Sequence, residues 1–419
     1  MSDTDRLSVP LGDGTLEFAL PDCSVTVATP PGADPVDVHD AADRAVSTPH
    51  GPPLEDRVDS SDDVAIVVTD VTRDVPDDVL LEVVLGELTR CGIDHEQVTV
   101  VVGLGLHRPM SDAEIEAMLG EHADLAVNHD PNSVVSVGEV DGCPVEIGKP
   151  IAEADTVLST GVVEPHQYAG FSGGAKTVVI GAGSESLIRY THGPDMLARE
   201  GVRLGRIDSN PFRETLDAAG DLVGIDYCIN LTHGPHGVLG VAAGDPRSVV
   251  EELAATARDA LSVPIDRTYD AVVCGVGAPK DANLYQATRV ATYAALGDRN
   301  PVAGGGRLVV PASLPEGAGQ GTGERRFYDR LRMASDAESL YREMREGYEP
   351  GAQRAFVVAR VLREHDVYVT NSQSPAVVEE CLMCAEPTVE DALEQGAEVL
   401  VVPDGIHTLL VDGQRRDIS

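Results

Sequence analysis

A lysine in a glycine-rich loop is the first feature of the sequence that suggests chemistry. The stretch from His166 reads HQYAGFSGGAKTVVIGAG, and its Lys176 is one of only three lysines in the chain. A buried ammonium can lose its proton and become a nucleophile, which a guanidinium cannot do. From Gly170 the letters fit the phosphate-loop pattern G-x-x-x-x-G-K-[ST] except at Ala175, and no buried strand directly precedes them. We therefore set aside a nucleoside triphosphate site and keep Lys176 as a candidate nucleophile.

Polar residues follow the carboxyl ends of two apolar runs. Asp70, Thr72 and Arg73 come after VAIVVT, and His107 comes after VTVVVGLG. Ligands of parallel sheets bind beyond these ends, so both segments are candidates for a site. The alternatives are a helix N-cap for Asp70 and an exposed loop position for His107.

Two more groups of polar residues follow later runs. DTVLSTGVV leads to His166, to the loop with Lys176 and then to His192. After AVVCGVG come Gln286 and Arg289, three positions apart. If this segment is helical, their side chains lie on one face and together could hold a carboxylate. Acid/base groups on two sides of one carbon are what a racemase or epimerase needs. The residues alone do not decide which histidine is a base and which a metal ligand.

Five motifs in order along most of the chain resemble the lactate racemase family, whose members use a nickel-pincer nucleotide. They are D-V-T-R from Asp70, G-L-H-R-P-M-S around His107, H-x-x-x-G-F-S-G-G-x-K from His166 to Lys176, the following His192, and L-Y-Q-x-x-R from Leu284 to Arg289. The third motif is specific.

The resemblance implies a covalent cofactor. Lys176 is similar to the lysine that carries pyridinium-3,5-bisthiocarboxylic acid mononucleotide through a thioamide, and His192 to the ligand of its nickel. Imidazole suits nickel in such a tetragonal setting. The segment that resembles the binding site for the nucleotide portion consists of Asp70, Val71, Thr72 and Arg73, the last of these also near the substrate.

The resemblance also implies the reaction, which is the interconversion of D- and L-lactate. His107 and His166 resemble the paired acid/base residues: one removes the hydroxyl proton of a 2-hydroxy acid while its Cα hydride passes to the cofactor, and hydride then returns to the opposite face. Gln286 and Arg289 would hold the substrate carboxylate. The family typically has lysine where this chain has Arg289. This change indicates either another substrate or the replacement of lysine by arginine throughout the chain, and we favour the second.

Several alternatives stay open. The same cofactor could act on malate, a longer-chain 2-hydroxy acid or a sugar acid. A more distant alternative is a Schiff base between Lys176 and pyridoxal phosphate. Another is a protein that binds the nucleotide without catalysis, which the presence of both His107 and His166 disfavours. The resemblance further implies transient contact with cofactor-maturation proteins.

The acidic excess limits the classes of partner. The chain has 70 Asp and Glu against 31 Lys and Arg, a net charge of -39, and no basic surface for nucleic acid or an anionic membrane. Apolar residues make up 42% and fall in regular blocks, so the charge belongs to the surface of a folded protein. Such a composition is typical of halophilic archaeal proteins, since salt screens the repulsion.

The cysteines and the N-terminus favour a cytoplasmic protein. The seven scattered cysteines indicate a reducing compartment, and Cys381 and Cys384 have C-x-x-C spacing without a second pair, which favours buried free thiols. The start MSDTDRLSVPL has no signal-peptide pattern, and no apolar run is long enough to span a membrane. His233 and His236, in THGPHG, are interpreted as parts of a turn rather than as a metal site.

Strand-like and helix-like segments alternate, which predicts an α/β fold with mainly parallel sheets. Ser111 and Glu114 form a capping box for one helix. An exposed segment near residue 265 divides the chain into two α/β domains: 1–264, with the cofactor and the acid/base histidines, and 265–419, with the carboxylate clamp. A cleft between the domains is the expected active site.

Overall fold

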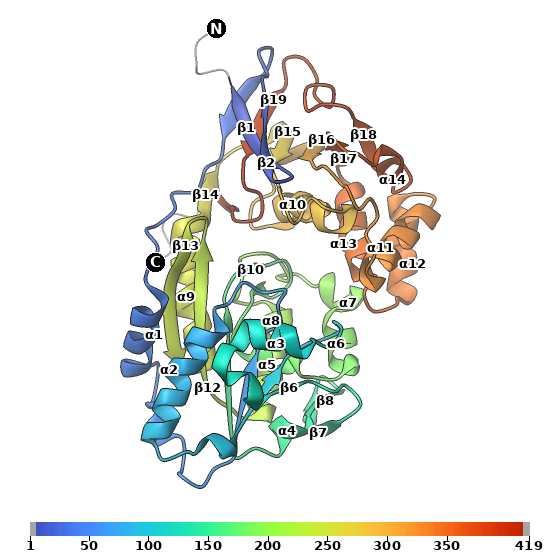
Figure 1. The fold of residues 1–419 in the computed structure, drawn as a ribbon. Coiled ribbons are helices and arrows are strands. Elements are labelled where there is room, and N and C mark those ends of the chain that lie inside the picture. Colours follow the sequence, from blue (N-terminus) through green and yellow to red (C-terminus); the bar gives the residue numbers. More distant parts are fainter. Residues whose placement is uncertain (1–5, 414–419) are drawn as a thin grey trace. The chain divides into compact units, whose positions relative to one another are not determined.

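The computed structural model describes residues 6–413, which form two compact units (Figure 1). The first unit consists of Gly32–Thr191 and Arg199–Ala260. The second unit consists of the described parts of Met1–Pro31, His192–Ala198 and Leu261–Ser419. The opening residues that were read for a signal sequence begin in 1–5, outside the described part.

The two units are not contiguous in sequence, unlike the expected division at 265. The junction at Ala260 lies close to that boundary, but residues 6–31 and 192–198 are grouped with the second unit. Strand pairing explains the first segment, because β3 (Ser24–Val27) pairs in parallel with β19 (Glu398–Val402). His192 therefore falls in the second unit rather than in the N-terminal domain where it was expected.

The first unit is built on a six-stranded sheet in which only the β12–β13 pair is antiparallel. The order is β13 (Gly237–Gly244), β12 (Ile225–Gly234), β9 (Thr156–Val162), β4 (Val64–Val68), β5 (Val98–Val102) and β6 (Ala126–Asn128). Every residue of β4 and β9 is buried. Strands covered on both faces have no solvent side, and for this reason they read as nearly continuous apolar runs.

Helices cover both faces of this sheet. Ile66 and Val68 pack in one core with α1 (Val38–Ser47), α2 (Asp77–Arg90) and α3 (Asp112–Leu119). Ala65 and Val67, which point the other way, pack in a second core with α4 (Lys149–Ala152) and α5 (Ala175–Gly181). The remaining elements of this unit are η2 (Leu54–Asp56), η3 (His95–Gln97), η4 (Gly120–Leu125), the hairpin β7 (Val134–Val140) and β8 (Cys143–Gly148), the short pair β10 (Pro165–His166) and β11 (Gly170–Phe171), α6 (Glu185–Thr191), α8 (Pro211–Val223) and α9 (Pro246–Leu261).

The second unit has a six-stranded sheet that is parallel throughout. Its order is β18 (Cys384–Glu386), β17 (Asp366–Thr370), β16 (Val302–Pro311), β15 (Tyr269–Cys274), β19 and β3. The hairpin of β1 (Leu7–Leu11) and β2 (Gly14–Phe18) shares one core with β15 and β19. The other elements are α7 (Pro194–Leu197), β14 (Ser262–Ile265), α10 (Leu284–Leu296), α11 (Thr322–Met333), α12 (Ala337–Glu346), α13 (Gln353–Leu362), α14 (Pro375–Glu379) and β20 (Leu409–Asp412).

The predicted α/β class with mainly parallel sheets is confirmed, and so is the capping box, in which Ser111 Oγ accepts from Glu114 N at 3.4 Å. Two details of the expectation are wrong. The helix after Asp70 begins only at Asp77, so Asp70 is not its N-cap. Cys384 is an exposed free thiol, although Cys381 is buried as expected. In the described part of the chain, no helix is both long and apolar enough to cross a bilayer.

Candidate active site

The carboxyl ends of three neighbouring strands bring predicted residues together. β4 lies between β9 and β5, so the segments after these strands leave from the same edge of the sheet. Asp70 follows β4, His107 follows β5, and Glu164 follows β9. The grouping of Asp70 with His107 confirms the expectation that polar residues after parallel strands meet at the carboxyl edge of the sheet.

Asp70 and His107 form a carboxylate–imidazole pair. Asp70 Oδ2 lies 2.5 Å from His107 Nδ1, and Asp70 Oδ1 accepts from Thr72 N at 3.1 Å and from Thr72 Oγ1 at 2.5 Å. Burial acts to raise the pKa of the Asp70 carboxyl, but the hydrogen bonds from His107 and Thr72 hold this pKa below its usual range. An ionised Asp70 keeps the His107 proton on Nδ1 and leaves Nε2 as the basic nitrogen.

Sequence reasoning had placed Asp70 in a cofactor-binding segment and had not paired it with His107. The two residues are 37 positions apart, so no local pattern joins them. Only the adjacency of their strands could have indicated the pair. Val71, in the same segment, is 49% exposed.

Arg73 lies across the same edge from β4 to β9. Its Nη1 donates to Glu164 Oε1 at 2.5 Å, and its backbone N–H donates to Asp70 O at 3.0 Å. Glu164 was not singled out in the sequence, because it reads as one more carboxylate in an acidic chain. The ion pair fixes Arg73 beside the loop that Glu164 opens.

The glycine-rich loop is anchored to the sheet at two points. After the short pair β10–β11, Ser172 Oγ donates to Val162 O at 2.6 Å, and Gly174 N donates to Asn230 Oδ1 at 2.8 Å. Val162 ends β9 and Asn230 lies in the neighbouring β12. The loop is therefore anchored to the end of β9 and to the middle of β12 before it enters α5.

Position 170 requires glycine for two reasons, its backbone conformation and its close neighbours. Its φ is +77°, and a Cβ at this position would overlap the carbonyl oxygen of Arg206. Gly142 has nearly the same φ, +76°, but a Cβ there would have nothing within 4 Å. Replacing each glycine by alanine therefore separates two contributions to the loss of stability, the left-handed backbone conformation and the steric overlap.

We expect Gly170→Ala to lower the free energy of unfolding by about 3 kcal/mol or more, because it adds a backbone overlap to an unfavourable φ. Gly142→Ala should cost only about 1–2 kcal/mol, the cost of the left-handed conformation. Urea unfolding of the two variants and the wild type measures both values. Equal losses for the two variants would show that the overlap at Arg206 is relieved without strain.

Lys176 is the second residue of α5 and is 9% exposed. Burial lowers the pKa of its amine to about 7, and the positive charges of Arg73 and Arg213 act in the same direction. The carboxylates of Glu164 and Asp70 act against this shift. Near neutral pH a substantial fraction of Lys176 is thus a neutral amine, the form that attacks electrophiles.

His107 and His166 are both engaged at Nδ1, but by opposite kinds of partner: a carboxylate acceptor at His107 and backbone N–H donors at His166. His166 Nδ1 accepts backbone N–H groups from Tyr168 at 3.3 Å and Ala169 at 3.1 Å. The neutral tautomer favoured by these contacts carries its proton on Nε2. His107 Nε2 can therefore accept a proton, whereas the Nε2–H of neutral His166 can donate a hydrogen bond. The His166 ring also packs on Phe212, with centroids 6.2 Å apart.

A buried carboxyl group lies behind this edge of the sheet. Asp77, the first residue of α2, is 1% exposed and accepts from Thr160 Oγ1 at 2.5 Å and from Thr69 Oγ1 at 3.4 Å. Burial raises the pKa of Asp77 to about 7, and the charge of Asp78 adds to this, while the two threonine hydrogen bonds oppose it. The sequence reads Asp77 only as an acidic residue in the first turn of a helix.

We expect Asp77→Asn to change how stability depends on pH. The folded-state pKa of about 7 lies above the usual 3.8, so the unfolded chain releases this proton first and the wild type loses stability as pH rises from 3.8 to 7. Asn is neutral throughout, so the variant should gain about 4 kcal/mol relative to the wild type between pH 4 and pH 8. Urea unfolding at constant salt measures the difference. The exposed neighbour offers a control, Asp78→Asn, which should show little of this dependence.

The second unit carries the other predicted residues. Gln286 and Arg289 lie in α10, so their expected helical spacing is confirmed, and both are half-buried. α10 follows the carboxyl end of β15, and its N-cap Asn283 accepts from Gln286 N at 3.1 Å. His192 lies between α6 and α7.

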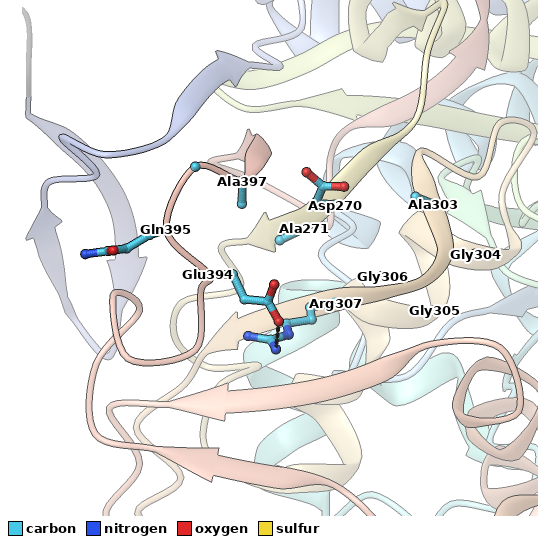
Figure 2. Close-up of a pocket in the computed structure, with 11 residues that line it drawn as sticks. Asp270, Ala271, Ala303, Gly304, Gly305, Gly306, Arg307, Glu394, Gln395 and Ala397 are labelled. Atoms are coloured by element: carbon cyan, nitrogen blue, oxygen red, sulfur yellow. Dashed lines mark hydrogen bonds and ion pairs between the residues drawn. The ribbon is translucent and has the colours of Figure 1, made fainter.

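A cavity of about 300 Å³ lies at the amino ends of the strands of the second unit's six-stranded sheet, near the first residues of β15 (Figure 2). Arg307 and Glu394 face each other across it at 2.5 Å. None of the residues predicted to bind substrate or cofactor lines this cavity. Ligands of parallel sheets bind at the carboxyl ends of strands, so we do not assign the cavity to the active site.

The histidines of THGPHG lie at the β12–β13 hairpin, which confirms the predicted turn. His233 Nε2 lies 2.6 Å from Asp74 O. Over residues 6–413, no group of three or more His, Cys, Asp or Glu side chains is arranged to bind a metal ion. The family expectation requires only one protein ligand for the metal, His192, and a single ligand forms no such group.

The fold and these residues define an α/β enzyme with a buried, weakly basic lysine beside a carboxylate–histidine pair. Residues 11–205 match the model of the lactate racemase N-terminal domain, and residues 266–413 match that of the lactate racemase C-terminal domain. The two matched regions span most of the chain. The chain therefore belongs to the lactate racemase family.

Individual relatives agree with this membership. The lactate racemase of Lactiplantibacillus plantarum is 27% identical over 377 residues, which cover 85% of this chain and 87% of the relative. That of Thermoanaerobacterium thermosaccharolyticum is 24% identical over 432 residues, covering 97% and 99%. The structure of the lactate racemase apoprotein from the latter organism has a TM-score of 0.85 at 23% identity, covering 97% of this chain and 99% of that one. A crystal structure of a Thermotoga maritima protein has a TM-score of 0.63 at 17% identity, covering 90% and 98%.

Proposed function

We propose that this enzyme racemises a 2-hydroxy acid, with lactate as the first candidate, and that it uses a nickel-pincer nucleotide attached to Lys176. One observation supports this most strongly: a buried lysine with a lowered pKa lies near Asp70, the partner of His107, in a chain of the lactate racemase family. A lysine prepared as a nucleophile suits a covalently held cofactor.

The residues fit such a cofactor. The neutral amine of Lys176 can form the thioamide bond, and His192 would be the protein ligand of nickel. The nucleotide portion would be bound by the segment Asp70, Val71, Thr72 and Arg73. When bound, the cofactor would supply the group that accepts the substrate Cα hydride and returns it.

The two histidines would handle the hydroxyl proton. His107 Nε2, left without a proton because Asp70 engages Nδ1, would remove this proton from one enantiomer. His166 would serve the other enantiomer: its Nδ1 accepts from two backbone amides, so its Nε2–H can hydrogen-bond the substrate oxygen, and these amide contacts would have to open for His166 to carry a second proton. Racemisation requires an acid/base group for each enantiomer, and the two histidines would supply them.

The substrate carboxylate is assigned to Gln286 and Arg289. Their amide and guanidinium side chains are separated by three residues of α10, the spacing at which two side chains lie on one helix face. Arg73 is a second candidate for the carboxylate, but it is paired with Glu164 at 2.5 Å and would have to leave that partner. A guanidinium in place of lysine at position 289 leaves malate, longer-chain and sugar acids as further substrates to test.

The experiment uses protein from a host shown to make the cofactor. We expect a mass excess that maps to the peptide containing Lys176, about one nickel per chain, and loss of optical rotation with one enantiomer of a 2-hydroxy acid. Unmodified Lys176 and no nickel would contradict the proposal. An absorbance near the visible edge that disappears on borohydride reduction would instead indicate a pyridoxal Schiff base.

A further inference from the structure

Arg213 is a buried arginine whose donors point at the glycine-rich loop. It lies in the first turn of α8 and is 4% exposed. Its Nη2 donates to the carbonyl oxygens of Phe171 and, at 3.3 Å, of Ser172, while its Nη1 lies 3.4 Å from that of Gly173. One guanidinium thus contacts three successive carbonyls, and these lie just before α5.

The carboxylate of Asp217 does not by itself explain the burial of Arg213. Asp217 Oδ1, one turn further along α8, lies 3.4 Å from Arg213 Nη1, and burial raises the pKa of the Asp217 carboxyl. Taking a guanidinium out of water is costly unless its donors are satisfied. Here the loop carbonyls accept from Nη1 and Nη2, while Nε is buried and has no hydrogen-bond partner among residues 6–413. The contacts that offset part of the cost of burying the charge therefore depend on the conformation of the loop.

We propose that Arg213 is the positioning residue for Lys176: its planar guanidinium gathers the carbonyls of residues 171–173 and thereby fixes the backbone from which α5 presents the lysine. The inference deepens the proposed function, on which it rests for the role of Lys176. A guanidinium suits this task because its donors form a rigid fork, whereas an ammonium is a compact charge on a flexible stem.

The charge of Arg213 has a second consequence for Lys176. It favours the neutral amine, as the charge of Arg73 does, while Glu164 and Asp70 favour the ammonium. Removal of the Arg213 charge should therefore raise the pKa of the lysine as well as release the loop. The loop keeps its other anchors, Ser172 on Val162 and Gly174 on Asn230, so we expect local loosening rather than unfolding.

The test uses three variants of the full-length apoprotein. Arg213→Gln removes the charge and most donors, and Arg213→Lys keeps the charge without the fork. The control is Arg247→Gln, since Arg247 pairs with Asp217 at 3.9 Å and with Asp221 at 2.5 Å and is not among the groups that shift the pKa of Lys176.

Two readouts separate charge from position. The first is the pH profile of Lys176 labelling by trinitrobenzenesulfonate, followed by peptide mass mapping, which should be half-maximal near pH 7 in the wild type. Arg213→Gln should label roughly fivefold more slowly at pH 7, as expected when the pKa rises by about one unit. Arg213→Lys should keep the wild-type profile. The second readout is hydrogen exchange of residues 170–176, which should accelerate in both Arg213 variants and stay unchanged in Arg247→Gln.

Wild-type exchange of the loop in Arg213→Lys, together with wild-type labelling in Arg213→Gln, would overturn the proposal. If Arg213→Gln does not fold, as judged by exchange of the β4 and β5 amides, the loop exchange of Arg213→Lys decides alone. Neither readout needs the cofactor. A result that contradicts the role of Arg213 therefore leaves the proposed function standing. An unmodified but normally reactive Lys176 in a cofactor-producing host contradicts only the proposed function.

Discussion

We expect Lys176→Arg to abolish attachment of the proposed cofactor and to remove the enzymatic rate enhancement, which for enzymes is typically about 10⁶-fold or more. Arginine keeps the positive charge and similar length, but its guanidinium stays protonated and cannot act as a nucleophile. Protein produced with the cofactor-maturation proteins should therefore show no mass excess on the peptide with residue 176. Racemisation of the 2-hydroxy acid substrate should fall to background.

The chain offers a matched control because it has so few lysines. Lys149 is exposed on α4 and pairs with Glu153 at 3.6 Å, so Lys149→Arg changes the same residue type away from the loop. It should retain attachment and full activity. Residual racemisation by Lys176→Arg within about tenfold of the wild type would rule out an obligatory covalent link at this lysine.

The sequence predicted the features that depend on local patterns. Apolar runs placed the parallel strands, the capping box at Ser111 was visible in four letters, and the spacing of Gln286 and Arg289 anticipated their place in one helix. The strand-end rule correctly grouped the segments of Asp70 and His107. These successes share a cause: each depends on residues close in sequence or on the regular geometry of a sheet.

Features that depend on distant packing were not predicted. The pairing of Asp70 with His107 joins neighbouring strands, and that of Arg213 with the loop joins residues about 40 positions apart. Asp77 looks like any acidic residue at a helix start, although it is buried against Thr160. Pairing of β3 with β19 joins two segments that are far apart in sequence. The spacing of apolar residues in the sequence does not indicate such contacts, because burial of a single polar side chain does not alter the apolar pattern around it.

Asp70→Asn should lower racemisation by about 10²–10⁴-fold, the range associated with general acid/base catalysis. The amide keeps the size of the carboxylate but carries no charge to stabilise protonated His107. Its NH2 group can also donate to His107 Nδ1, which would place the ring proton on Nε2 and remove the base. A steady-state assay in both directions should show the loss for D- and L-substrate alike, since both directions share one equilibrium constant.

A double-mutant cycle distinguishes this role from a structural one. If Asp70 acts through His107, Asp70→Asn should cost little further activity in the His107→Asn background. Because hydrogen bonds from His107 and Thr72 hold the pKa of Asp70 low, its contribution to stability is present above the usual Asp range and is lost only as pH falls through the folded-state pKa. A loss of activity that is independent of His107, with unchanged attachment at Lys176, would assign Asp70 to the cofactor instead. If the loss of activity occurs only when His107 is present, Asp70 acts by holding the His107 proton on Nδ1 and leaving Nε2 as the base.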